Sequence, residues 1–311
     1  MEGNVDELRE EINKFYSEND FKGLNKYFDN KCADFQLQSG VTQAEYVYIL
    51  NEAGSFYRDS GQFKKSVRAF ENLLKYMEDM ELSQTIEYAT VLNNLAGTNR
   101  MMGNYERARE LFFECIDLYE KIGRDDSFEY ASALNNIALL YLVQKDYKNA
   151  EQYQLRALKH KATGEGLTKA VSISNLANIY AAQGDIDKAL KTIETTHDIL
   201  KKVEDKETSR YVSVINTEAC LLMQKKEYNK ACVLFDQVLD VLRRASPMSQ
   251  DYAAVCKTAA GAYLGRGDIK KAIALQEEAL KIDERIFGAD SSAAVQDKVL
   301  VDGYRKREAQ E

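Results

Sequence analysis

The sequence predicts an all-α protein of about seven stacked pairs of antiparallel helices, followed by one further helix at the C-terminal end. Two observations lead to this prediction. A short motif returns seven times at a spacing close to 42 residues. In addition, the 311 residues include one proline and 16 glycines, so little interrupts a helix between copies.

Each copy of the motif reads a small or polar residue, a polar residue, an aromatic ring or Ile, two polar residues and a small residue. Successive ring or Ile positions are 42, 42, 42, 39, 42 and 41 residues apart, at Phe21, Phe63, Tyr105, Tyr147, Ile186, Tyr228 and Ile269. Such a period indicates repeated units, each contacting mainly its neighbours. We therefore expect function on a surface that the repeats share.

The first expected element is an irregular helix pair at residues 1–40, which we expect to cap the array. Apolar residues recur there at helical spacing, at Val5, Leu8, Ile12 and Phe15 and then at Phe21, Leu24 and Phe28.

Six regular helix pairs are expected over residues 41–288. In the pair at residues 86–123, a helical apolar pattern ends at Gly103, as a C-cap would end it, and a second one begins at Tyr105. Residues suited to N-capping precede the first helix of each pair: Thr42, Ser83, Asp126 or Ser127, Thr168, Ser209 and Ser249. Residues 289–311 are expected to form one polar capping helix.

Aligning the pairs on the Gly103 position defines the expected core. Eleven residues before it stand Leu50, Leu92, Leu134, Ile173, Ile215 and Cys256, and seven before it stand Gly54, Ala96, Ala138, Ala177, Ala219 and Ala260. After the turn comes a column of small residues, at Ser66, Ala108, Ala150, Ala189, Ala231 and Ala272. Small residues let paired helices approach closely, so we expect these columns to be buried.

These columns resemble those of the tetratricopeptide repeat over nearly the whole chain. The resemblance implies a right-handed superhelical solenoid whose first helices line a concave groove. The family's usual period is 34 residues. The longer period here is similar to the kinesin-light-chain type, as is Leu134-Asn135-Asn136-Ile137-Ala138, although the His-Pro of that subfamily's linker is replaced by Asp126-Ser127 and Ser291-Ser292.

Positions 13, 10, 6 and 3 before the glycine column lie within about 80° of one another on each first helix, away from the core columns. By the resemblance, this set faces a ligand. The column at position 10 is Asn51, Asn93, Asn135, Ser174, Asn216 and Lys257. Because an amide both donates and accepts hydrogen bonds, we predict that this column holds the backbone of a peptide. The alternative is that these amides, and the neighbouring Asn94, Asn136 and Asn175, bond to the adjacent repeat or to water.

The remaining face positions are basic early in the chain and more apolar later. Arg58 and Arg100 are predicted to pair with a carboxylate of the partner, and the alternative is pairing with local acids such as Asp59 and Glu52. The later residues predicted on the same face are Leu139, Leu142, Asn178 and Met223.

Composition limits the other classes of function. The net charge of −8 weighs against nucleic acid. An acidic start and the absence of a long apolar stretch predict neither secretion nor a membrane span. The five cysteines indicate reduced thiols in a cytoplasmic protein, and the two histidines, His160 and His197, have no expected metal or catalytic partners. We therefore expect no enzyme activity, no metal and no cofactor.

The leading hypothesis is a non-enzymatic scaffold or adaptor that holds a protein or peptide segment in the groove. Two alternatives remain open. One is a peptide-sensing regulator that resembles the bacterial quorum-response receptors but lacks their DNA-binding domain. The other is a structural element that assembles into homo-oligomers when an end helix docks into a neighbouring copy.

Overall fold

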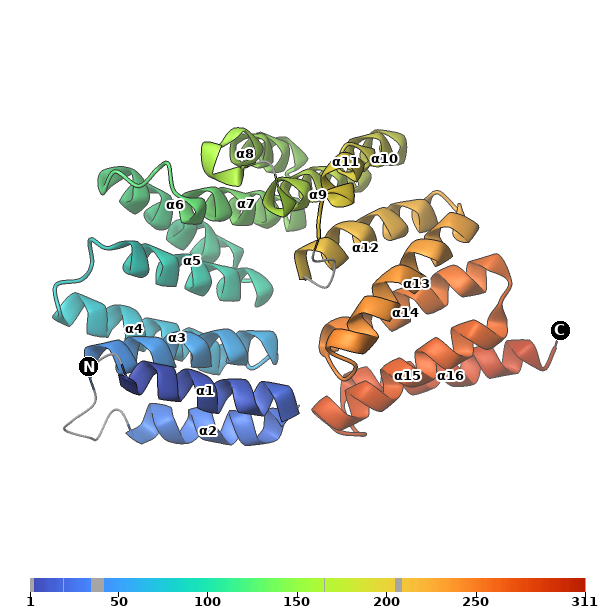
Figure 1. Ribbon diagram of the computed structural model, residues 1–311, viewed down its shortest axis with the longest axis horizontal. Helices are drawn as coiled ribbons and strands as arrows, with labels where there is room; N and C mark the ends of the chain where they lie inside the picture. The colour runs from blue at the N-terminus through green and yellow to red at the C-terminus, as the bar shows by residue number, and fades with distance from the viewer. Residues whose placement is uncertain (1–2, 19, 35–41, 165, 205–208, 311) are drawn as a thin grey trace. The chain divides into compact units, whose positions relative to one another are not determined.

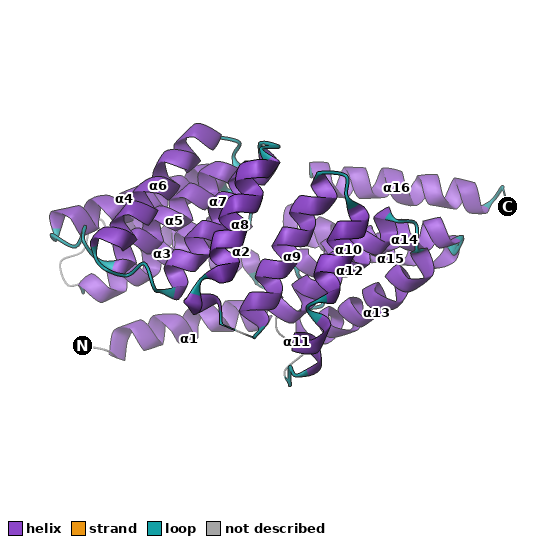
Figure 2. Ribbon diagram, turned by 90° about the horizontal axis from the view of Figure 1, so that it is seen from above, coloured by secondary structure: helices purple, strands orange, loops and turns teal. Residues whose placement is uncertain are grey.

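The computed structural model describes residues 3–18, 20–34, 42–164, 166–204 and 209–310, which form helices and their connecting loops (Figure 2). Contacts divide the chain into two units, residues 1–162 and 163–311. Each unit is a stack of helix pairs, so the predicted all-α repeat architecture is confirmed within each of them. Among the described helices, none is long and apolar enough to cross a membrane.

Unit 1 contains four helix pairs (Figure 1). Its helices are α1 (Gly3–Glu18), α2 (Phe21–Asp34), α3 (Gln43–Asp59), α4 (Phe63–Asp79), α5 (Ile86–Met101), α6 (Tyr105–Lys121), α7 (Phe128–Val143) and α8 (Tyr147–Lys159). Each helix packs against the next, and the first helices α1, α3, α5 and α7 also contact one another in that order.

Unit 2 is built of the same kind of helix pairs, and a short 3-10 helix, η1 (Lys161–Thr163), lies at the boundary in the sequence. Its helices are α9 (Leu167–Ala182), α10 (Ile186–Glu194), α11 (His197–Lys201), α12 (Ser209–Gln224), α13 (Tyr228–Ala245), α14 (Gln250–Arg266), α15 (Ile269–Phe287) and α16 (Ser292–Glu308). The first helices α9, α12 and α14 contact one another in order, and α16 packs against α15.

The predicted core columns are buried in both units. The small residues that follow the turns have no exposed surface at all, and they are Ser66, Ala108, Ala150, Ala189, Ala231 and Ala272. Leu92 and Leu134 of the leucine column are 2% and 1% exposed. These residues set the close approach of the two helices in each pair.

The turn between the helices of each regular pair has the same backbone geometry in all six pairs. The residue at the glycine column has a φ between 61° and 91°, at Gly61, Gly103, Lys145, Gly184, Lys226 and Gly267. The N–H of the following residue donates to the carbonyl five residues before it, as in Asn104 N to Asn99 O at 2.9 Å and Asp146 N to Tyr141 O at 2.9 Å. This is the Schellman arrangement that ends helices, so the predicted C-caps are confirmed.

The N-cap predictions are confirmed in three pairs and need correction in two. Thr42, Ser127 and Ser249 each accept a hydrogen bond from a backbone N–H of the first turn. The cap of α5 is Thr85 rather than Ser83, because the helix begins at Ile86. Thr168 lies inside α9, whose first turn follows Gly166 and has no side-chain cap. The prediction of Ser209 as a cap is not tested, because Ser209 is the first described residue of α12 and residues 205–208 lie outside the described part of the chain.

The single 39-residue spacing falls where the structure divides. Helix α8 has 13 residues, whereas α4 and α6 have 17 each. In the next pair, the second helix is interrupted at Thr195 and Thr196, whose hydroxyls donate to the carbonyls of Thr192 and Ile193 at 2.7 Å each. Side chains that bond to nearby carbonyls weaken a helix, and this accounts for the break between α10 and α11.

Candidate ligand-binding faces

The predicted face residues of unit 1 lie on three first helices that contact one another. Their side chains are all partly exposed, and they are Asn51 and Arg58 on α3, Asn93 and Arg100 on α5, and Asn135, Leu139 and Leu142 on α7. We call this set the unit 1 face. Core columns on the same helices are buried, so the helical periodicity separates the two sides as predicted.

The asparagines of the unit 1 face connect neighbouring repeats. Asn94 Nδ2 donates to Asn51 Oδ1 at 3.2 Å, and Asn136 Nδ2 donates to Asn93 Oδ1 at 3.0 Å. Each bond joins residues 43 positions apart, one repeat plus one residue. The bonding to the adjacent repeat that the sequence left open as an alternative is therefore present in these two pairs.

Asn135 forms two bonds within its own helix pair. Its Nδ2 donates to Ala131 O at 3.0 Å, and its Oδ1 accepts from Gln154 Nε2 of α8 at 2.5 Å. Gln154 has no exposed surface, so this bond links the face to the interior of the pair.

Two arginines on the unit 1 face lie close enough for their charges to interact. The Arg58 Nε donates to Asp59 Oδ1 at 2.9 Å, which is the local pairing that the sequence suggested. The Nε of Arg100 is buried and has no hydrogen-bond partner among the described residues. Burial, and then the positive charge of Arg58, lower the pKa of Arg100. A guanidinium in this setting favours the approach of an anion.

Glu52, the other local acid suggested as a partner, accepts instead from Asn51 Nδ2 at 3.3 Å. Burial raises the pKa of Glu52, and the Asn51 bond and the charge of Arg9 oppose this rise. No carboxylate of the described residues forms an ion pair with Arg100, so the two arginines differ in their surroundings.

Three of the predicted binding residues of unit 2 are partly exposed, one is buried and one is held in ion pairs. Asn178, Asn216 and Met223 are partly exposed on α9 and α12. Two residues need correction. Ser174 is 2% exposed, because α12 packs closely on α9, so we leave it out of the proposed binding residues. Lys257 is engaged by two buried acids, with Nζ 2.6 Å from Asp283 Oδ2 and 3.0 Å from Asp297 Oδ2.

Comparison of the sequence with models of known protein families shows which family has this architecture. A tetratricopeptide repeat model matches residues 45–121, 87–163 and 129–202, and a second one matches residues 258–293. The chain is a tetratricopeptide repeat protein. The matches cover more than half of its length, and they include every residue of the unit 1 face.

Solved structures of this fold are similar at low sequence identity. The Rap conjugation gene regulator of the plasmid pLS20, in complex with the Phr* peptide, has a TM-score of 0.62 and 13% identity over 90% of this chain and 75% of that one. A Rap protein complexed with Competence and Sporulation Factor has a TM-score of 0.56 and 13% identity over 99% of both chains. BtubC (BKLC) from P. vanneervenii has a TM-score of 0.53 and 19% identity over 76% of this chain and 93% of that one. No curated protein matches the sequence.

Proposed function

We propose that this tetratricopeptide repeat protein is a non-enzymatic scaffold that binds a peptide or protein segment carrying a carboxylate on the unit 1 face. The observation that carries the proposal is the pair Arg58 and Arg100. The guanidinium of Arg100 is largely removed from water, and its Nε has no hydrogen-bond partner among the described residues. The positive charge of Arg58 also lowers the pKa of Arg100.

A carboxylate from a partner would relieve this arrangement. It accepts two parallel hydrogen bonds from a guanidinium, and it offsets the repulsion between the two cations. The partly exposed amides of Asn93 and Asn135 lie on the same face and supply donors suited to peptide carbonyls. Leu139 and Leu142 on α7 add apolar surface next to them.

The test reverses the charge of Arg58 and Arg100, and the control reverses the charge of two arginines on α6, which carries no residue of the unit 1 face. Arg58→Glu with Arg100→Glu changes the unit 1 face, whereas Arg107→Glu with Arg109→Glu makes the same change in charge on α6. Both proteins are used to select from a random peptide library, after circular dichroism has confirmed that each is folded.

The parent protein and the α6 variant should enrich peptides that contain Asp, Glu or a free C-terminal carboxylate. The face variant should lose this preference, with an affinity for the enriched peptides at least tenfold weaker, because each charged hydrogen bond contributes about 1.5–3 kcal/mol. Selection of the same peptides by the face variant would show that the arginine pair is not the recognition element.

The second candidate, a peptide-sensing regulator, is favoured by the similarity to the Rap conjugation gene regulator in complex with the Phr* peptide. The two functions differ in what a bound peptide changes. In a scaffold, amide hydrogen exchange should slow only in α3, α5 and α7. In a regulator, it should also slow in second helices such as α6 and α8, which carry no face residues.

A further inference from the structure

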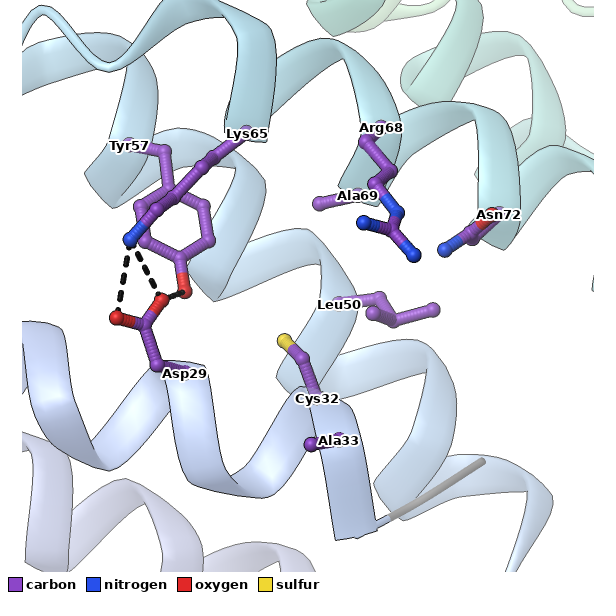
Figure 3. Close-up of a pocket in the computed structure, with 9 residues that line it drawn as sticks. All are labelled: Asp29, Cys32, Ala33, Leu50, Tyr57, Lys65, Arg68, Ala69 and Asn72. Carbon is purple, nitrogen blue, oxygen red and sulfur yellow. Dashed lines mark hydrogen bonds and ion pairs between the residues drawn. The ribbon is translucent and has the colours of Figure 1, made fainter. Parts of the chain in front are cut away.

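A pocket of about 230 Å³ lies in unit 1 between α2, α3 and α4 (Figure 3). None of its lining residues belongs to the unit 1 face. They are Asp29, Cys32, Ala33, Leu50, Tyr57, Lys65, Arg68, Ala69 and Asn72. The pocket therefore needs an explanation separate from that of the proposed peptide-binding face.

One end of the pocket is closed by a network whose charges cancel. Tyr57 OH donates to Asp29 Oδ1 at 2.6 Å, and Lys65 Nζ lies 2.8 and 2.9 Å from the two Asp29 oxygens (Figure 3). Burial acts to raise the pKa of Asp29, but the bonds from Lys65 and Tyr57 outweigh it, so the pKa is lower than usual. Asp29 is thus ionised and fully engaged, and it offers little to a ligand.

The opposite end carries a positive charge that the described residues do not neutralise. Arg68 and Asn72 are four residues apart on α4, and both side chains line the pocket (Figure 3). Within the described part of unit 1, no carboxylate pairs with Arg68. The lining acids and bases, Asp29, Lys65 and Arg68, leave one net positive charge.

Between the two ends the pocket is apolar. Leu50 and Ala69 are 2% and 5% exposed and form part of the wall, together with Ala33 and the thiol of Cys32. Burial, and then the charge of Asp29, raise the pKa of Cys32 to about 11, although Lys65 opposes the rise. The thiol is uncharged at neutral pH, so it does not repel an anion.

We propose that this pocket binds a small monocarboxylic acid, with its carboxylate on Arg68 and Asn72 and its apolar part over Leu50 and Ala69. The size fits one ring or a short aliphatic chain: a protein cavity of about 150 Å³ accommodates benzene, and the larger volume here leaves room for the carboxylate. A planar guanidinium binds a carboxylate through two parallel hydrogen bonds, and the amide supplies a third donor.

The test compares phenylacetate with phenylacetamide, which has the same shape but no charge. Each is titrated into the full chain, and binding is followed by calorimetry and by the rate at which iodoacetamide alkylates Cys32, resolved by mass spectrometry. Phenylacetate should bind at least tenfold more tightly than the amide and should slow alkylation of Cys32. Equal binding of the two compounds, or none by either, overturns the proposal.

Variants locate the site. Arg68→Gln should weaken phenylacetate binding at least tenfold, and Ala33→Leu, at an exposed position, should narrow the pocket and weaken both compounds. Arg107→Gln on α6 removes another exposed arginine outside the pocket and should bind as the parent does. Unchanged binding by Arg68→Gln, with its fold confirmed by circular dichroism, also overturns the proposal.

A tripeptide that ends in phenylalanine distinguishes two sources of this ligand. Binding no tighter than that of phenylacetate assigns the pocket to a free acid, and tighter binding assigns it to the C-terminal residue of a chain. Both outcomes support the pocket as a carboxylate site. If the charge-reversal test shows that Arg58 and Arg100 do not recognise peptides, the proposal for this pocket still stands, because none of its lining residues belongs to the unit 1 face.

Discussion

At the residue scale, Lys145 and Lys226 occupy turn positions where the other regular repeats have glycine. Their φ values of 61° and 64° lie in the left-handed region, which a residue with a Cβ adopts at a cost of about 1 kcal/mol. The Schellman hydrogen bonds that follow them match those of the glycine turns. The two lysines therefore retain the geometry of the turn and lose part of its stability.

Lys145→Gly and Lys226→Gly are each expected to raise the free energy of unfolding by about 0.5–1 kcal/mol, because they relieve this strain. Urea denaturation followed by circular dichroism measures the change. Lys75→Gly, at an exposed position inside α4, serves as the control and should lower stability by about 1 kcal/mol. A loss of stability in the two turn variants would show that the unfolded-state entropy of glycine outweighs the strain.

Cys32 provides a second test at this scale, through its pKa of about 11. Only the thiolate reacts with iodoacetamide, so the alkylation rate should rise about tenfold per pH unit from about pH 7 to pH 10. An ordinary exposed thiol has a pKa of about 8.5 and levels off above it. Cys115 is fully buried and should stay unreacted in the folded chain. A plateau for Cys32 near pH 8.5 would contradict its burial in the pocket.

At the element scale, a buried polar cluster fastens α16 to α14 and α15. Lys257 Nζ contacts Asp283 and Asp297, whose side chains are 5% and 3% exposed, and Gln276 Nε2 donates to Asp297 Oδ1 at 3.0 Å. Burial raises the pKa of Asp297, although Lys257 opposes the rise. Two acids share one lysine here, so the cluster holds one more negative than positive charge.

Lys257→Met should lower the free energy of unfolding by about 3 kcal/mol, because it leaves two buried carboxylates without a cation. Thermal and urea denaturation measure the loss.

Asp297→Asn should raise stability at pH 7. The folded-state pKa of Asp297 lies above the unfolded value, so ionisation of this group opposes folding at neutral pH. This penalty fades as the pH falls through the folded-state pKa, and the gain of the variant should vanish only below the unfolded-state pKa of about 3.9, where the aspartate is protonated in both states. A variant less stable than the parent at pH 7 would show that the Lys257 contact outweighs burial.

The helices themselves could be predicted closely from the sequence, because the same apolar pattern and the same turn motif recur in six successive helix pairs. The first residue of each helix is harder to predict. Ser83 and Thr85 both suit an N-cap, and the structure places Thr85 there, where its hydroxyl accepts from the backbone N–H of Tyr88 at 3.2 Å. Thr168 failed for a related reason, since α9 begins without a side-chain cap.

At the scale of the whole molecule, the sequence could predict which side of a helix is exposed but not what each side chain contacts. Ser174 and Lys257 share a column with Asn93, yet one is buried and the other pairs with acids from α15 and α16. The pocket beside Arg68 combines residues of α2, α3 and α4 from two different pairs. Such combinations depend on packing between repeats, which a column in one alignment does not contain.

The stacking of repeats also predicts how far a local loss of stability extends along the chain. Because each pair contacts mainly its neighbours, a local defect should remain local. In Lys257→Met, amide hydrogen exchange should accelerate in α14, α15 and α16 while α3 to α6 keep the protection of the parent. Mass spectrometry of peptides from these helices measures both regions in one sample. Equal acceleration in both would mean that the array unfolds as a single cooperative body.

The bonds from Asn94 to Asn51 and from Asn136 to Asn93 have a consequence for molecular recognition. If a peptide N–H takes the place of the Asn136 amide on the oxygen of Asn93, the total number of hydrogen bonds stays nearly constant. Such an exchange contributes little to affinity. It does reward a ligand whose donors recur with the spacing of the first helices. In the proposed function, the asparagines would therefore select the length and registration of a bound chain, and the arginines of the same face would supply most of the binding affinity.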